Sequence, residues 1–109
     1  MSIPMPAIVG DYFTAENHHD SDAVAQCLAA DGVVHDDGHA YAGHAAIQAW
    51  KEAGSKQYGA VIHPASADTQ GARCVVIGSV SGSFPGSPLE LRFAFTLANN
   101  RIQTLEISA

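Results

Sequence analysis

Two side chains in the first third of the chain have the chemistry for proton transfer at a carbonyl compound. They are the carboxyl group of Asp36 and the phenol of Tyr12. Burial of a carboxyl group in an apolar hollow raises its pKa, which suits a general base that works near neutral pH. A buried phenol can donate a hydrogen bond to a carbonyl or enolate oxygen and stabilise the charge that develops there. These residues are the first candidates for a catalytic pair.

Both candidates also have a structural interpretation. Asp36 precedes Asp37-Gly38, and Asp-Gly is common in surface turns, so its carboxylate can belong to such a turn. If Val34 faces the core, however, the two-residue period of a strand places Asp36 on the same face, pointing into the hollow. Tyr12 lies on an apolar helical stripe in either case. Its buried hydroxyl needs a hydrogen-bond partner, which can be backbone or water rather than a ligand.

The segment after Val34 also contains a candidate metal-binding pattern. His35-x-Asp37-x-His39 would bring two imidazoles and a carboxylate to one face of a strand, which is the ligand set of a two-His-one-carboxylate site. If Asp36 points inward, however, His35 and Asp37 point outward, and Gly38 ends the strand before His39. We therefore expect no metal site here.

The remaining histidines add two secondary candidates. Histidine titrates near neutral pH, so His35 or His63 could assist a proton transfer. The alternation around His63 is too irregular to decide whether it lines a pocket or faces solvent. We assign His18 and His19 to a solvated loop between helices, and His44 to the surface at a helix start.

The elements that must position these residues follow from the spacing of apolar side chains. Apolar residues recur at intervals of three and four in three stretches, which predicts helices around residues 5–13, 24–28 and 43–54. Residues 33–36 read as a short strand, and residues 38–43 as a turn or a brief return strand. Tyr12 is thereby placed on the first helix and Asp36 at the end of the strand.

The second half of the chain has the two-residue period of strands. Turn residues divide it into four of them, over residues 58–68, 73–84, 89–97 and 101–108. In the last strand Ile102 breaks parity with Leu105 and Ile107, which predicts a β-bulge or an uncertain register. The predicted fold class is α+β, with three N-terminal helices packed on one face of a curved antiparallel sheet. A curved sheet closed by helices leaves a conical hollow that suits a small ligand.

We expect an apolar wall around this hollow. Its members would come from the third helix and from inward positions of the strands, namely Trp50, Phe84, Phe93, Phe95 and Val34. In such a small domain the same aromatic side chain can serve both as core and as pocket wall.

Composition limits the class of protein. A chain of 109 residues has room for one domain, residues 1–109, and its 47% hydrophobic content excludes a disordered tail. The net charge of −6, without a Lys/Arg stripe, argues against nucleic acid as a partner. No apolar run fits a membrane span or a signal peptide, so we expect a cytoplasmic protein. Cys27 and Cys74 lie in apolar segments and are predicted to be buried thiols.

Four stretches that span nearly the whole chain carry a family resemblance. They are Tyr12-Phe13-x-Ala15-x-Asn17-x-x-Asp20, Leu28-Ala29-x-Asp31-Gly32-Val33-Val34-His35-Asp36, Gly43-His44-x-Ala46-Ile47-x-x-Trp50, and Phe93-x-Phe95-x-Leu97 followed by Asn99-Asn100-Arg101-Ile102. In order and content they resemble the nuclear transport factor 2-like superfamily, in its SnoaL-like or ketosteroid isomerase-like branch. The resemblance implies a cystatin-like cone. It leaves the reaction open, because this fold hosts many chemistries.

The sharper similarity is to ketosteroid isomerase, which has a tyrosine on an apolar helix and then an aspartate on a short strand. Tyr12 and Asp36 are 36 − 12 = 24 positions apart and match that pattern without a gap. The resemblance implies that Tyr12 takes the place of the oxyanion-hole phenol and Asp36 that of the general base. The protonated acid that completes the isomerase's oxyanion hole falls near Phe93, which cannot donate a hydrogen bond.

Two functions from different classes follow. The first is a cofactor-free isomerase, lyase or polyketide cyclase-like enzyme, in which Asp36 takes a proton beside the carbonyl of a small apolar molecule and Tyr12 stabilises the oxyanion. The second is a non-catalytic binding or dimerisation module of the same fold, favoured by the missing donor at Phe93. In relatives the outer sheet face, which here carries Arg92, packs against a second copy, so the resemblance also implies a homodimer.

Overall fold

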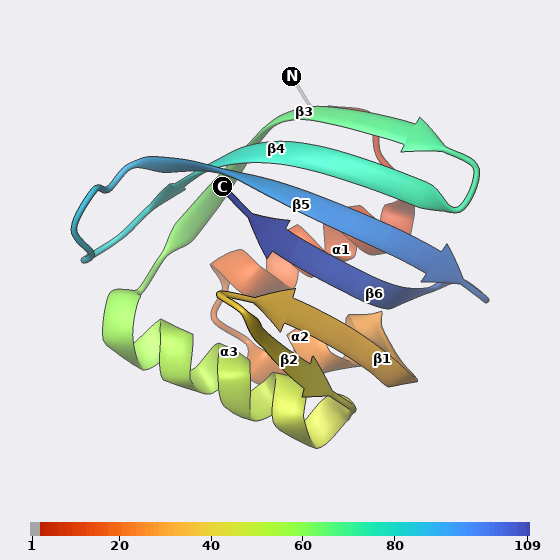
Figure 1. The fold of residues 1–109 in the computed structure, drawn as a ribbon, viewed down its shortest axis with the longest axis horizontal. Coiled ribbons are helices and arrows are strands. Elements are labelled where there is room, and N and C mark those ends of the chain that lie inside the picture. Colours follow the sequence, from red (N-terminus) through yellow and green to blue (C-terminus); the bar gives the residue numbers. More distant parts are fainter. Residues whose placement is uncertain (1–2) are drawn as a thin grey trace.

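The computed structural model describes residues 3–109, which form three helices packed against a curved sheet of six strands (Figure 1). The helices are α1 (Ala7–Asn17), α2 (Ser21–Cys27) and α3 (His44–Tyr58). The strands are β1 (Leu28–Asp36), β2 (His39–Ala42), β3 (Val61–Gln70), β4 (Arg73–Ser81), β5 (Leu89–Ala98) and β6 (Arg101–Ser108). The predicted α+β class is confirmed.

The sheet has the strand order β2-β1-β6-β5-β4-β3 and is antiparallel except for one parallel pair, β1 with β6. The sheet is therefore mixed, whereas the sequence predicted an antiparallel one. A parallel partner cannot be recognised from the period of either strand, because the period is the same in both arrangements. The pairing sets Asp36 directly beside Ile107 in register, at the end of β1.

Capping residues fix the start of α2 and the end of α3. The side chain of Asp20 accepts a hydrogen bond from the backbone N–H of Ala23 at 3.1 Å, which starts α2. Gly59 has a left-handed backbone with φ of 56°, which ends α3. This helix therefore runs one turn beyond its predicted end at Gly54, and the following strand starts at Val61 rather than at Tyr58. Within residues 3–109 no helix has the length and apolar character needed to cross a bilayer.

The core lies between α1 and the inner faces of β4 and β5. Phe13 packs edge-on against Phe93 and Phe95, with ring centroids 5.3 Å and 5.7 Å away. Tyr12 packs edge-on against Phe95 at 5.5 Å. Edge-to-face aromatic pairs add about 0.5–1.5 kcal/mol each to the free energy gained from burial. These rings therefore form an aromatic layer between α1 and the sheet.

Two local predictions are confirmed. The register between β5 and β6 shifts where Leu97 pairs with Ile102, which is the β-bulge expected from the broken parity. Cys27 and Cys74 are both buried and not paired in a disulfide. Burial also raises the pKa of the Cys27 thiol above its usual value.

Asn17, at the end of α1, ties that helix to the sheet. Its Nδ2 donates a hydrogen bond to the carbonyl oxygen of Ile62 at 2.8 Å, and the backbone N–H of Ile62 donates to its Oδ1 at 2.7 Å. Both bonds span 45 positions in the chain. Asn17 therefore ties the end of α1 to the start of β3.

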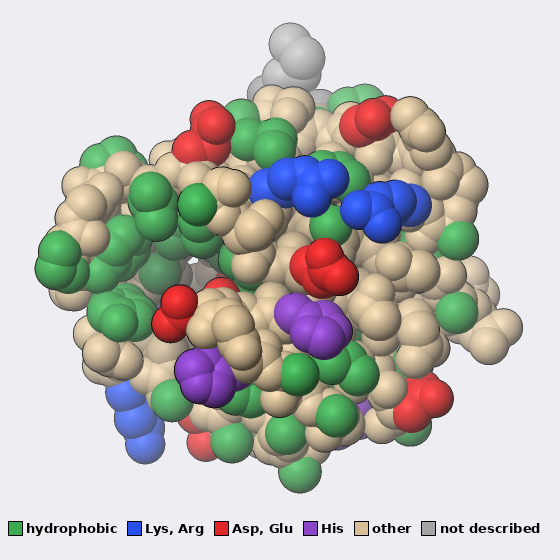
Figure 2. All heavy atoms as spheres, in the orientation of Figure 1, with side chains coloured by type: hydrophobic (Ala, Val, Ile, Leu, Met, Phe, Trp, Pro, Cys, Tyr) green, Lys and Arg blue, Asp and Glu red, His purple; other side chains and the backbone are tan. Residues whose placement is uncertain are grey.

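The face of the sheet turned away from α1 carries charged and small apolar side chains together. Figure 2 views this face and shows basic and acidic side chains over β5 and β6, with histidine side chains beside them over β1 and β2. In register, Arg92 pairs with Ile77, while Ala94 lies between Val75 and Glu106. Ala94 is only 5% exposed because its larger neighbours cover it.

Candidate functional site

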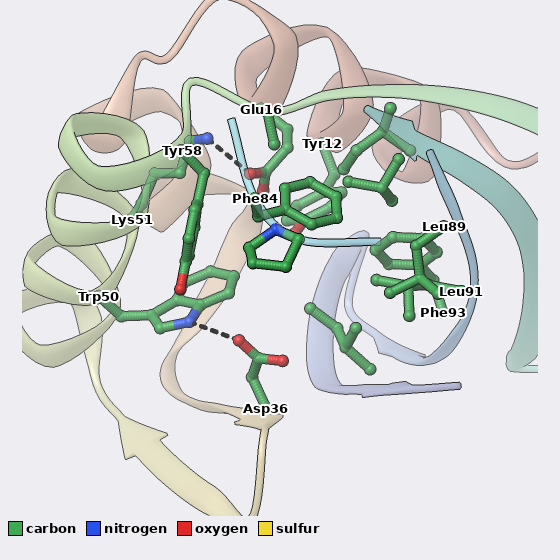
Figure 3. Close-up of a pocket in the computed structure, with 16 residues that line it drawn as sticks. Tyr12, Glu16, Asp36, Trp50, Lys51, Tyr58, Phe84, Leu89, Leu91 and Phe93 are labelled. Atoms are coloured by element: carbon green, nitrogen blue, oxygen red, sulfur yellow. Dashed lines mark hydrogen bonds and ion pairs between the residues drawn. The ribbon is translucent and has the colours of Figure 1, made fainter. Parts of the chain in front are cut away.

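A pocket of about 500 Å³ lies between α1, α3 and the inner face of the sheet (Figure 3). Most of its wall is apolar or aromatic: Trp50, Gly54, Tyr58, Ala60, Ile62, Val80, Phe84, Pro85, Leu89, Leu91, Phe93 and Ile107. Four polar residues complete the lining, and they form two groups. Asp36 makes up one, and Tyr12, Glu16 and Lys51 make up the other. A volume and lining of this kind are typical of small-molecule sites.

Asp36 lies at the end of β1 and lines the pocket, as the two-residue period from Val34 predicts. Nε1 of Trp50 donates a hydrogen bond to its Oδ2 at 3.1 Å (Figure 3). Within residues 3–109 no hydrogen bond reaches Oδ1. One carboxylate oxygen is thus held in place by α3, while the other is left available to a ligand.

Tyr12 is fully buried on α1 and is among the residues that line the pocket, and its hydroxyl makes no well-formed hydrogen bond among the described residues. Burial raises the pKa of Tyr12 well above its usual value of 10.0, and the negative charges of Glu16 and Asp36 raise it further. Glu16, one helical turn away, raises the pKa both by its charge and by the closeness of its carboxylate to the phenol O–H. Tyr12 therefore keeps its proton near neutral pH and is a hydrogen-bond donor.

Glu16 and Lys51 form a buried ion pair beside Tyr12. Nζ of Lys51 lies 2.6 Å from Oε1 of Glu16, and the two residues are only 4% and 9% exposed, respectively. The same Nζ is 3.5 Å from Nδ1 of His19. Oε2 of Glu16 is buried and has no hydrogen-bond partner among the described residues.

This ion pair was not predicted from the sequence, although the spacing contains a signal for it. Glu16 follows Tyr12 by four residues, and Lys51 follows Ile47 by four. Residues four apart share one face of a helix, so both charged side chains continue the buried stripes of α1 and α3.

The structure brings only part of the predicted set to the pocket. Phe95 and Val34, predicted as wall residues, are fully buried in the core instead, with Phe95 lying against the ring of Tyr12. His35 and His63 are exposed and lie outside the lining, because Asp36 and Ile62 occupy the inward positions next to them. Five predicted residues line the pocket: Tyr12, Asp36, Trp50, Phe84 and Phe93.

The other histidines have structural contacts. His44 is half-buried, and its Nε2 donates to the carbonyl oxygen of Leu28 at 2.7 Å, so it joins α3 to β1 rather than lying plainly on the surface. His18 and His19 are exposed after α1, as predicted. Nδ1 of His39 bonds the carbonyl oxygen of Asp37 at 2.9 Å. In the part of the chain that the structure describes, no three His, Cys, Asp or Glu side chains are grouped to hold a metal ion.

The curved mixed sheet, the three helices packed on it and the single-chain pocket between them define a fold of the nuclear transport factor 2-like class, also called cystatin-like. The sequence profile of the SnoaL-like domain matches residues 9–103. The chain therefore belongs to the SnoaL-like domain family, and the predicted resemblance is confirmed.

Solved structures agree with this assignment. A candidate polyketide cyclase from Sinorhizobium meliloti is 39% identical, with a TM-score of 0.92 over 95% of each chain. A Catenulispora acidiphila protein with a ketosteroid isomerase-like fold, in complex with trimethylamine, is 18% identical, with a TM-score of 0.88 over 97% of this chain and 87% of that one. An epoxide hydrolase/cyclase-like enzyme of pyran ring formation in polyether salinomycin is also 18% identical, with a TM-score of 0.78 over 93% and 86%. At 18% identity, the last two structures show only that the fold is shared. No curated protein matches the chain.

Proposed function

We propose that this protein is a cofactor-free isomerase, lyase or cyclase that transfers a proton on a small, largely apolar carbonyl compound. The observation that carries the proposal is that Asp36 and Tyr12 line the same pocket. A base and a hydrogen-bond donor that face one ligand are what proton abstraction next to a carbonyl requires.

In the proposed reaction Oδ1 of Asp36 takes a proton from the carbon beside the carbonyl. The electrons of that C–H bond move toward the carbonyl oxygen, which becomes an enolate oxygen. The hydroxyl of Tyr12 donates a hydrogen bond to this oxygen as its charge grows, and its raised pKa keeps the phenol protonated for this role. The proton on Asp36 then returns to the ligand at the same or another carbon. Trp50 holds the base in position through Oδ2.

The apolar wall supports the choice of ligand. Leu89, Leu91, Phe93 and Ile107 give most of the surface no means of binding a highly polar molecule. The 39% identical relative from Sinorhizobium meliloti, a candidate polyketide cyclase, is consistent with a carbonyl-rich ligand.

Deuterium exchange tests the proposal without knowledge of the natural substrate. Benzylacetone, a small aromatic ketone, is incubated with the protein in deuterated buffer, and loss of its α-proton signal is followed by NMR. We expect exchange above the buffer rate, and we expect Asp36→Asn to lower it by about 10²–10⁴-fold, the usual contribution of a general base. Thermal unfolding should show that the variant remains folded.

Asp37→Asn is the matched control. It removes the same charge from the adjacent position, where the side chain is exposed and outside the pocket lining. Its backbone φ of 52° is also one that asparagine adopts readily. Equal exchange by wild type and Asp36→Asn would overturn the proposed mechanism. Binding of the ketone without any exchange would favour the alternative, a non-catalytic binding module.

We also propose that a second copy of the chain covers the outer sheet face. On this face the charged residues Arg92 and Glu106 lie among the half-buried apolar residues Val75 and Ile77. Two copies related by a two-fold axis can therefore pair opposite charges around an apolar centre. Sedimentation should give a dimer for wild type and a monomer for Ile77→Lys with unchanged thermal unfolding of each subunit. A monomeric wild type would overturn this assignment.

A further inference from the structure

One β-hairpin, formed by β1 and β2, contacts the indole of Trp50 in two ways. Nε1 of the indole donates a hydrogen bond to Oδ2 of Asp36, at the end of β1, at 3.1 Å (Figure 3). The ring of Tyr41, on β2, packs beside the indole with ring centroids 5.9 Å apart and an interplanar angle of 33°. Trp50 itself comes from α3, which packs against both strands. The proposed base and an aromatic neighbour of the indole therefore belong to the same hairpin.

The turn of this hairpin determines which side chains share a face. Its two residues, 37–38, both have positive φ, of 52° and 75°, as a tight two-residue hairpin turn requires. In the resulting register Tyr41 lies directly opposite Val34. Residues opposite each other in a ladder point to the same face, and Asp36 lies two residues beyond Val34 on that face. Tyr41 is thus on the inner side of the sheet, toward α3.

The hydrogen bond alone does not determine how the indole lies. A tryptophan side chain has two rotatable bonds, and Trp50 is half-buried, so its N–H can rotate away from Asp36 and donate to water. The ring of Tyr41 occupies the space beside the indole and restricts this rotation. Tyr41 is not among the residues that line the pocket, so any effect that it has on a ligand must pass through Trp50.

We infer that Tyr41 is a positioning residue: by packing against the indole of Trp50, it keeps Nε1 donating to Oδ2 of Asp36. The inference rests on the proposed function for the role of Asp36 as the base. It adds a residue outside the pocket to the groups on which the reaction depends.

The indole proton gives a test that needs no ligand. Trp50 is the only tryptophan of the chain, so its indole N–H gives a single NMR signal. We expect Tyr41→Leu to speed the exchange of this proton with water by about tenfold or more, while Tyr41→Phe, the matched control that keeps the ring, changes it by less than about twofold. Tyr41→Thr, which suits a strand, replaces Tyr41→Leu if that variant does not fold.

The backbone amides of β5 and β6 are the internal reference for this measurement, and their exchange rates should stay the same. An unchanged indole exchange rate after loss of the ring would overturn the inference. Equal acceleration of the reference amides would also overturn it, because Tyr41 would then stabilise the fold in general rather than the position of the indole.

A double-mutant cycle tests whether Tyr41 acts through Trp50. Deuterium exchange into benzylacetone is measured against pH for Tyr41→Leu, Trp50→Phe and the double variant. We expect each single variant to lower the maximal rate by about tenfold and to raise the pH of half-maximal exchange, because a hydrogen bond to the charged form of a carboxyl group favours that form. The double variant should be within about twofold of Trp50→Phe, since residues that act as a unit are not additive. Tyr41→Phe should keep the wild-type pH profile.

The other ionisable groups around Asp36 are the same in all these variants, so a shift between their profiles reports the indole bond. On the adjacent strand β6 the neighbour in register is the apolar Ile107. The ionisable groups are His39 opposite Asp36 on β2, Tyr12 and Glu16 on α1, and Lys51 and Tyr58 on α3.

If the double variant multiplied the two single losses, or if Tyr41→Leu kept the wild-type pH profile, the inference would be wrong. The proposed function fails on a different result. A wild type that exchanges no deuterium refutes the proposed catalysis, and the indole signal alone then decides whether Tyr41 holds Trp50 on Asp36.

Discussion

Two carboxylates line the same pocket, and their surroundings differ. Asp36 is half-buried at the end of β1 and receives one hydrogen bond, from the neutral indole of Trp50. Glu16 is buried on α1 and is paired with the ammonium group of Lys51 at 2.6 Å. The residue types are nearly equivalent, so the difference in their chemistry has to come from their partners.

A general base has to accept a proton during the reaction. Protonation of Glu16 would break a buried ion pair, which leaves Lys51 as an uncompensated charge. Protonation of Asp36 leaves the indole hydrogen bond in place, since a protonated carboxyl group still accepts through its other oxygen. The comparison therefore supports the proposed role of Asp36 as the base, and leaves Glu16 as the structural partner of Lys51. Each of the following predictions tests one side of this division.

The largest expected effect is on stability, from breaking the ion pair. Lys51→Met leaves the Glu16 carboxylate buried without its cation, and we expect the free energy of unfolding to fall by about 3–5 kcal/mol. Urea unfolding followed by the fluorescence of Trp50 measures this change. The double variant Glu16→Leu/Lys51→Met should recover most of the loss, because apolar residues of similar volume often replace a buried pair without cost. A loss below about 1 kcal/mol in the single variant would contradict the description of Glu16 as a buried, ionised group.

The next effect concerns Tyr12 and pH. The folded protein keeps the phenol proton above the pKa of 10.0 at which the unfolded chain releases it. Since the folded state then binds more protons, its stability is fully present below pH 10.0 and declines as the pH rises further. We expect wild type to lose about 1.4 kcal/mol per pH unit relative to Tyr12→Phe in this range. The free energy of unfolding of both proteins is measured by urea unfolding from about pH 9 to about pH 11. Equal changes with pH in the two proteins would contradict a buried phenol.

The sequence predicted the direction of Asp36 and Tyr12 correctly because each lies in a segment with a regular period. Val34 sets the inward face of β1, and two residues later that face holds Asp36. The period of a strand does not show whether an inward-facing side chain reaches the pocket or is buried beneath other residues. That depends on which side chains pack over it. Phe95 is on the predicted face but is covered by the ring of Tyr12, so it belongs to the core.

Glu16 and Lys51 were missed for a chemical reason. Charged side chains on a helix usually face solvent. Glu and Lys are therefore expected on the outer surface, even at positions that continue the buried face of a helix. They are buried here because they neutralise each other across α1 and α3, which requires contact between residues 35 positions apart. The parallel pairing of β1 with β6 is likewise a long-range contact, and local spacing contains no signal for it.

The smallest expected effect tests whether the two carboxylate groups account for the polar chemistry of the pocket. His35 is adjacent to Asp36 in sequence but lies on the opposite, exposed face of β1, and His63 is in the same relation to Ile62 on β3. Because neither imidazole lines the pocket, His35→Ala and His63→Ala should each change the deuterium exchange rate by less than about twofold, well under the 10²-fold or more of a lost general base. If either variant lowered the exchange rate nearly as much as Asp36→Asn does, an imidazole outside the pocket lining would have to take part in the proton transfer. The division of roles between Asp36 and Glu16 would then be incomplete.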